Sequence, residues 1–282
     1  MRTPGAVGVT ALAAALLSIS VAYADPDLAV RIGILDDRIA EEPGNAELYL
    51  ARAELYREAG DWPKVFADLD RVAAIRPDDP ELGFRRGRAL IDAGRVAEGR
   101  AALDRFLATH PDHAPARIER ARLLARGGER DAAVRDWDAA LAAASKPVPD
   151  LYLERARLLL APPARLDDAL AGIDQGVARL GPLVTFVTFA VDAEAARARP
   201  AAAIAWIDRL PPHLRALPRW LARRAELLDA AGKKDEALVA RCDALTGLRA
   251  LPPSRRAAKA NAELYQALAA RAAGRCPGDD AH

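Results

Sequence analysis

The sequence predicts an all-α protein built from repeated antiparallel helix pairs. Alanine dominates an apolar content of 51%, whereas aromatic residues make up only 5%, and alanine is the strongest helix former. Runs rich in Val, Ile and Thr, which are typical of strands, are almost absent after the N-terminus. Several residue columns also recur every 34 positions, and such a period indicates a repeat architecture.

Five columns share this 34-residue period. They are Arg52-Ala53, Arg86-Gly87 and Arg120-Ala121; Gly60, Gly94 and Gly128; Pro77 and Pro111; Leu69, Leu103 and Trp137; and Val72, Phe106 and Ala140. Within one unit, Gly60 is expected to end the first helix, because glycine adopts the left-handed conformation without a Cβ penalty. A second helix is predicted from about 62 to 75, and Pro77 breaks it before the next unit.

The pattern resembles the tetratricopeptide repeat family, in a variant with Arg-Ala or Arg-Gly where other members carry Leu-Gly. The residues that carry the resemblance in the first unit are Tyr49, Arg52-Ala53, Tyr56, Gly60, Trp62, Val65, Leu69, Val72 and Pro77. A fourth unit follows at Arg155-Ala156 and a sixth at Arg224-Ala225, whereas the fifth, about 183–210, is degenerate. The resemblance spans about 44–248 and implies a right-handed superhelical solenoid of antiparallel helix pairs.

Two further helices are expected to cap this solenoid, at about 25–42 and about 254–273. The end of a solenoid needs a cap, because its terminal unit otherwise leaves an apolar face in water. Proline-rich joints at 147–149, 162–163, 211–212 and 252–253 are interpreted as turns between helices. Residues 25–276 are therefore predicted to form a single domain, with 277–282 as a disordered tail.

The first 24 residues have the organisation of a secretory signal peptide. Arg2 precedes an apolar stretch, and Ala22-Tyr23-Ala24 supplies a small-residue cleavage site, so cleavage is expected after Ala24. The alternative is a retained membrane anchor, which is disfavoured because the apolar run is short for a membrane span. A bacterial protein in the periplasm or secreted from the cell is the expected location.

The charge balance narrows the class of partner. Removing Arg2 with the signal segment leaves 40 basic and 40 acidic residues. A neutral chain with mixed charges has no field that attracts nucleic acid or an anionic membrane. We therefore expect a protein or peptide partner, and neither nucleic acid nor a membrane after signal cleavage.

Arginine and aspartate recur at fixed places in successive units, which predicts a structural ladder. Each arginine lies in a first helix and each aspartate lies late in a second helix, so that the two could meet within or between repeats. Partly buried arginine needs a partner, and a carboxylate suits its forked geometry. The predicted ladder comprises Arg52, Asp70, Arg86, Asp104, Arg120, Asp138, Arg155 and Asp174.

In the tetratricopeptide family the concave groove is lined by particular first-helix positions. Carried onto this chain, they predict a partner-binding groove of Leu50, Glu54, Arg57, Phe84, Arg88, Ile118, Arg122, Arg126, Leu153 and Arg157. An apolar strip beside successive arginines suits an extended or helical peptide with acidic groups. The alternative is that these arginines only make local pairs, such as Arg88 with Asp92 one helical turn on.

The sequence offers little for catalysis, metal binding or cofactor binding. His110 and His113 flank Pro111, which breaks the helix that would align them, and no nearby residue completes a ligand set. No nucleophile elbow, glycine-rich phosphate loop or HExxH motif is present. We predict no enzymatic activity, no metal and no cofactor.

Cys242 and Cys276 are the only cysteines of the chain. An oxidising compartment would favour a disulfide between them. If the last helix runs back along the second helix of the sixth unit, however, the two cysteines lie of the order of 20 Å apart, beyond bridging range. The sequence leaves this question open, although the geometry disfavours the bond.

The resemblance implies a scaffold or adaptor that binds a peptide or protein segment in its groove, possible roles being cell-envelope assembly or export. The alternative is a structural subunit of an oligomeric envelope complex, which uses its convex or terminal faces and has no groove client. Both expectations rest on fold analogy, since function depends on sites rather than on folds.

Overall fold

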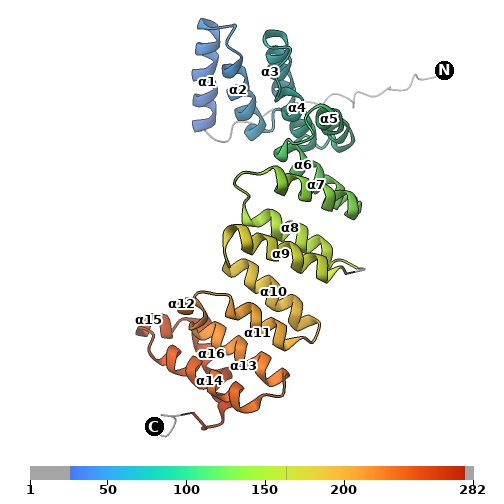
Figure 1. The fold of residues 1–282 in the computed structure, drawn as a ribbon. Coiled ribbons are helices and arrows are strands. Elements are labelled where there is room, and N and C mark those ends of the chain that lie inside the picture. Colours follow the sequence, from blue (N-terminus) through green and yellow to red (C-terminus); the bar gives the residue numbers. More distant parts are fainter. Residues whose placement is uncertain (1–25, 163, 277–282) are drawn as a thin grey trace, which may run out of the picture. The chain divides into compact units, whose positions relative to one another are not determined.

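The computed structural model describes residues 26–162 and 164–276, and every regular element among them is a helix (Figure 1). The predicted signal peptide, 1–24, and the predicted tail, 277–282, lie outside the described residues. The described residues group into two compact units that meet in the sequence between Ala143 and Ala144, and each is described by itself. The all-α fold of antiparallel helix pairs is confirmed, whereas the single continuous domain stays a prediction.

The first unit contains a single helix followed by three helix pairs. Helix α1 (Pro26–Glu41) precedes the pairs α2 (Ala46–Ala59) with α3 (Trp62–Ile75), α4 (Leu82–Asp92) with α5 (Val96–Thr109), and α6 (Ala114–Arg126) with α7 (Arg130–Ala143). The two helices of each pair pack against each other, and α3 packs on α4 as α5 does on α6.

The recurring columns of the sequence form the core of this unit. Leu69, Leu103 and Trp137 are at most 3% exposed. The column of Val72, Phe106 and Ala140 is buried as well. Each of these residues lies in the second helix of its pair, so the 34-residue period marks the positions that pack against the first helices.

Caps fix where the helices of the first pair begin and end. The Asn45 side chain accepts a hydrogen bond from the Glu47 amide at 3.1 Å and starts α2. Gly60 ends that helix with a φ of 72°, a left-handed conformation that favours glycine. Asp61 then starts α3, so that only two residues separate the paired helices.

The pair α4 and α5 crosses closely at Gly99. A Cβ at this position would lie 2.6 Å from Ile91 Cγ1 and 2.9 Å from the carbonyl oxygen of Gly87. Because one of these neighbours is backbone, the helices would have to separate to admit a side chain. The absence of a side chain at Gly99 therefore sets the distance between α4 and α5.

The second unit contains three further pairs. These are α8 (Pro149–Leu160) with α9 (Leu166–Leu180), α10 (Val184–Ala196) with α11 (Pro200–Asp208), and α13 (Pro218–Ala230) with α14 (Lys234–Arg249). The one-turn helices α12 (Pro212–Arg215) and α15 (Pro253–Arg256) lie in connections, and α16 (Lys259–Ala272) packs on α14. The degenerate fifth repeat is a regular helix pair, α10 with α11, and its Phe186 and Val187 are fully buried.

Cys242 and Cys276 form a disulfide, with their Cα atoms 5.3 Å apart. The geometric argument against this bond was wrong for two reasons. The last helix begins at Lys259 rather than near 254, because α15 and its flanking residues take up the connection. After Ala272, Ala273 and Gly274 have φ values of 50° and 71°, which end the helix and turn the chain.

No helix within the described ranges, 26–162 and 164–276, is long and apolar enough to cross a membrane.

Candidate partner-binding face

The helices that open each pair carry most of the residues predicted to bind a partner. We call the surface of α2, α4 and α6 the first-helix face of the first unit. Between α2 and α4 a crevice brings together the predicted residues Leu50, Glu54, Arg57 and Arg88. Its free volume is about 10 Å³, less than a water molecule needs, so a partner would lie across the crevice rather than inside it.

Ion pairs link the charged residues of this crevice across the two helices. Glu54 accepts from Arg57 Nε at 2.8 Å and from Arg88 Nη2 at 3.3 Å. Arg57 also donates to Asp92 at 3.2 Å. Asp92 therefore pairs with Arg57 of the preceding repeat, rather than with Arg88 as the local alternative supposed.

Arg85 is the fourth charged residue that lines the crevice, and the sequence prediction missed it. Its Nε atom is buried, and its side chain makes no hydrogen bond or ion pair with any residue that the structure describes. It directly follows Phe84, a predicted groove position. Three arginines thus surround a crevice that holds one glutamate, with Asp92 at its edge.

The third first helix, α6, contributes less to this face. Ile118 is half-buried, Arg122 bonds Glu119 of its own helix at 3.2 Å, and Arg126 is exposed. In the second unit, Arg157 is exposed on α8.

The apolar strip expected beside these arginines is not available to a partner. Leu50, Phe84 and Leu153 are at most 9% exposed, so they belong to the core. Phe84 is covered because the ring of His113 lies 4.9 Å from its own ring. Of the predicted apolar positions, only Ile118 keeps partial exposure.

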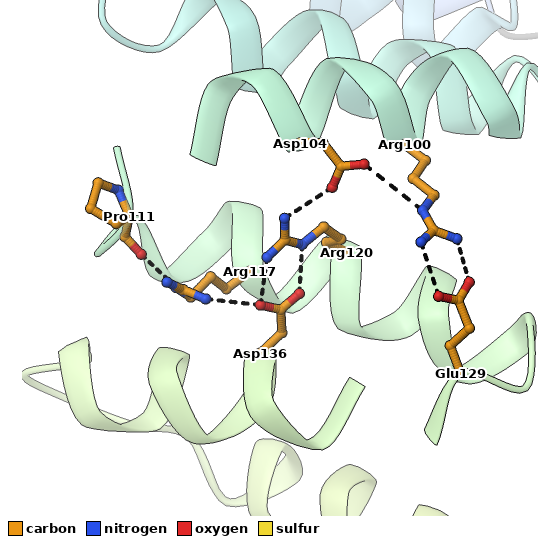
Figure 2. Close-up of polar contacts among 7 residues, drawn as sticks. All are labelled: Arg100, Asp104, Pro111, Arg117, Arg120, Glu129 and Asp136. Carbon is orange, nitrogen blue, oxygen red and sulfur yellow. Dashed lines mark hydrogen bonds and ion pairs between the residues drawn. The ribbon is translucent and has the colours of Figure 1, made fainter. Parts of the chain in front are cut away.

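The Arg–Asp contacts of the first unit join neighbouring helices, as Figure 2 shows around Arg120. Its guanidinium donates to Asp136 at 2.6 and 2.8 Å and to Asp104 at 2.9 Å. Arg117 donates to the same Asp136 at 2.8 Å. Arg120 therefore joins α5, α6 and α7 through two carboxylates.

The same geometry recurs at a spacing of 16 residues. Arg52 bonds Asp36 and Asp68, Arg86 bonds Asp70, and Arg224 bonds Asp208. The predicted contacts of Arg86 with Asp70 and of Arg120 with Asp104 are thus formed between neighbouring repeats. Sequence reasoning missed Asp36, Asp68 and Asp136, the last two of which are buried.

In the second unit the pair of Arg224 with Asp208 keeps this pattern, whereas the fourth and fifth repeats depart from it. Arg155 donates to the backbone carbonyl of Asp168 at 3.1 Å. Asp174 pairs with Arg209, and the fifth repeat has Phe189-Ala190 where the other repeats have arginine followed by a small residue. Asp138 is exposed on the same helix as Asp136, the buried carboxylate that Arg120 contacts.

The hydrogen bonds of these ion pairs stabilise the charged forms of several side chains. The hydrogen bonds that Arg52 and Arg120 donate to Asp68 and Asp136 are the largest cause of the raised pKa values of the two arginines. Arg100 lowers the pKa of Glu129 below its ordinary value of 4.5 by donating hydrogen bonds to it. Arginines that keep their protons supply cross-links between helices and not proton-transfer groups.

The histidine pair has structural contacts. The His113 Nδ1 accepts from the Ala116 amide at 3.1 Å and caps α6, while its Nε2 lies 3.0 Å from Glu81. The His110 ring stacks on Phe106 at 4.6 Å. Within the described residues, no three His, Cys, Asp or Glu side chains are grouped as a metal site.

Comparison with known proteins finds one family model that is similar to part of the chain. Residues 52–117 match the model of the tetratricopeptide repeat. The matched stretch contains every residue of the crevice between α2 and α4 except Leu50, together with Arg52, Arg86 and Asp104. Comparison with the curated proteins found no match.

Solved tetratricopeptide repeat structures share the fold of the chain. The C-terminal part of a repeat protein from Cytophaga hutchinsonii superimposes with a TM-score of 0.60 at 12% identity, over 81% of this chain and 93% of that one. PilW, a type IV pilus biogenesis factor, gives 0.51 at 23% identity, over 72% of this chain and 91% of its own. At these identities the likeness concerns the fold alone.

Proposed function

We propose that the chain is a protein-interaction scaffold that binds an acidic peptide or protein segment on the first-helix face of its first unit. The observation that carries this proposal is the crevice between α2 and α4, where Arg57, Arg85 and Arg88 converge around Glu54. A carboxylate of the partner would complete the pairing of Arg85, and arginine binds carboxylates through two parallel hydrogen bonds.

The exposure of this cluster suits recognition rather than folding. The Arg57 and Arg88 side chains are 33% and 34% exposed, so their pairs with Glu54 remain open to solvent. Exposed pairs contribute at most about 1 kcal/mol to stability. A partner carboxylate could therefore replace Glu54 at small cost, whereas the buried Asp136 could not be displaced from its arginines.

The proposal includes export to a periplasmic or extracellular location. The disulfide between Cys242 and Cys276 supports this assignment, since such bonds persist in oxidising compartments. The signal-like sequence before Asp25 also supports export. The proposal also includes a role in cell-envelope assembly or export. It further assigns the repeats to a variant with Arg-Ala or Arg-Gly. The proposal includes no catalytic step.

A second candidate function is a subunit that assembles through a terminal face. Two residues of α1, Val30 and Ile34, are 60% and 54% exposed and lie one helical turn apart. An exposed apolar pair on a terminal helix favours contact with another protein surface. Sedimentation of the purified chain tests this candidate, because assembly through α1 predicts an oligomer that Ile34→Lys dissociates.

Selection of peptides from a random displayed library tests the first candidate. We expect acidic sequences to be enriched on the protein and to be lost on the Arg85→Gln/Arg88→Gln variant. Arg105→Gln is the matched control, since Arg105 is exposed on α5, away from this face. Equal enrichment on all three proteins would refute the groove proposal.

A further inference from the structure

The second unit has a depression of its own, between the first helices α10 and α13. Its volume is about 310 Å³, and Val184, Thr188, Val191 and Trp220 form its largely apolar lining. A depression of this size falls at the lower end of the range for small-ligand sites. It is more than an order of magnitude larger than the crevice between α2 and α4, so a side chain can enter it.

The sequence explains why these residues share one face. Val184 and Arg219 lie 35 residues apart, as do Thr188 and Arg223. Each pair therefore takes equivalent positions in two consecutive first helices. The groove prediction stopped at the fourth repeat because the fifth lacks the Arg-Ala dipeptide, and so it missed this site.

The two arginines at the depression differ in their partners. Arg223 donates to Asp192 at 2.9 Å and to Glu226 at 3.0 Å, so its charge is balanced. Arg219 is exposed and forms no ion pair with the described residues; its guanidinium lies 6.0 Å from the Trp220 ring. Arg219 is therefore the arginine of the depression that can accept an acidic ligand group.

Trp220 contributes an aromatic ring to the lining of the depression. Its side chain is 5% exposed, and its Nε1–H is buried without an acceptor among the described residues. Buried donors in native proteins nearly always have a partner. Because this nitrogen has almost no accessible surface, a ligand in the depression would contact the indole ring, and the N–H signal would report the change in the surroundings of that ring.

We propose that this depression is a ligand site for an apolar side chain with a neighbouring carboxylate, as in a peptide that pairs a large apolar residue with an acidic group. The apolar side chain would cover Val184 and Val191, and the carboxylate would pair with Arg219. The site goes beyond the proposed function, because it lies in the other unit and selects for an apolar group as well as a charge.

A fragment titration tests the site with N-acetylphenylalanine as the probe. The full chain, labelled with ¹⁵N, has four tryptophans, and Trp220→Phe identifies the indole N–H signal of Trp220 in the NMR spectrum. We expect N-acetylphenylalanine to shift this signal with saturation. N-acetylphenylalaninamide, which lacks the carboxylate, should bind at least fivefold more weakly, and N-acetylglycine should give no saturable shift.

Two variants locate the probe. Arg219→Gln alters an exposed side chain without an ion pair among the described residues, so folding is retained and binding of N-acetylphenylalanine should weaken at least fivefold. Val184→Glu places a carboxylate in the first turn of α10, where the helix dipole favours it, and should abolish the shift by occupying Arg219. Thermal melts followed by circular dichroism verify that both variants are folded.

The Arg85→Gln/Arg88→Gln variant separates this site from the proposed function. It should bind N-acetylphenylalanine as the unaltered protein does, even though it loses the acidic peptides of the first unit. The proposal is overturned if the Trp220 signal does not shift with saturation, if N-acetylglycine shifts it equally, or if Arg219→Gln leaves the affinity unchanged.

Discussion

Replacing Asp136 with asparagine is expected to destabilise the first unit by about 3 kcal/mol. Asp136 is 3% exposed and accepts three hydrogen bonds, two from Arg120 and one from Arg117. Removing one partner of a buried ion pair costs about 3–5 kcal/mol. The lower end applies because Arg120 keeps Asp104, its side chain is 22% exposed, and asparagine retains one acceptor.

Urea unfolding followed by circular dichroism measures this change. With a slope of about 1–3 kcal/mol per molar urea, the loss shifts the midpoint by roughly 1 M or more. Asp138→Asn is the matched control, because Asp138 is exposed in the same helix and exposed pairs contribute at most about 1 kcal/mol. Equal midpoints for the two variants would refute the reasoning that the buried aspartate braces the helices.

Three further predictions concern packing, the disulfide and acid sensitivity. Gly99→Ala should lower the melting temperature because its Cβ meets backbone, with overpacking costing about 1–3 kcal/mol, whereas Gly33→Ala, which has open space around it, should raise stability by about 0.5–1 kcal/mol. Replacing Cys242 and Cys276 with serine should lower the free energy of unfolding by up to about 4 kcal/mol and make α16 sensitive to trypsin. An unchanged rate of proteolysis would contradict the idea that the disulfide holds α16 in place. The pKa of Glu129 is lowered by its arginine partner, so its stabilising effect exists above pH 4.5 and is lost as the pH falls through the folded value. The difference in the free energy of unfolding between the protein and Glu129→Gln should therefore be present at pH 7 and become smaller below pH 4.5. A difference that becomes larger below pH 4.5 would contradict the prediction.

The period of the sequence predicted the fold because each recurring residue has the same packing role in every repeat. Leu69, Leu103 and Trp137 are alike in burial, so their spacing alone identified the helix pairs. The ladder was harder to predict. Asp136 and Asp138 both lie in α7, only two residues apart. The rotation of α7 about its own axis decides which of the two carboxylates faces Arg120.

The candidate site was predicted in part for a similar reason. First-helix positions gave Glu54, Arg57 and Arg88, which the crevice brings together. The burial of Phe84 could not be predicted, because it depends on a contact with the ring of His113 in the next repeat. The disulfide was missed because the turn at Ala273 and Gly274 depends on backbone conformation, which no spacing rule reports.

The proposed binding of acidic segments is tested most directly by fluorescence anisotropy with one labelled acidic peptide obtained from the library selection. The account predicts that Arg85→Gln/Arg88→Gln weakens binding at least tenfold, whereas Arg105→Gln, an exposed arginine on α5, leaves the affinity unchanged. Equal affinities for all three proteins, or an equal loss in both variants, would contradict the assignment of the crevice between α2 and α4 as the binding site.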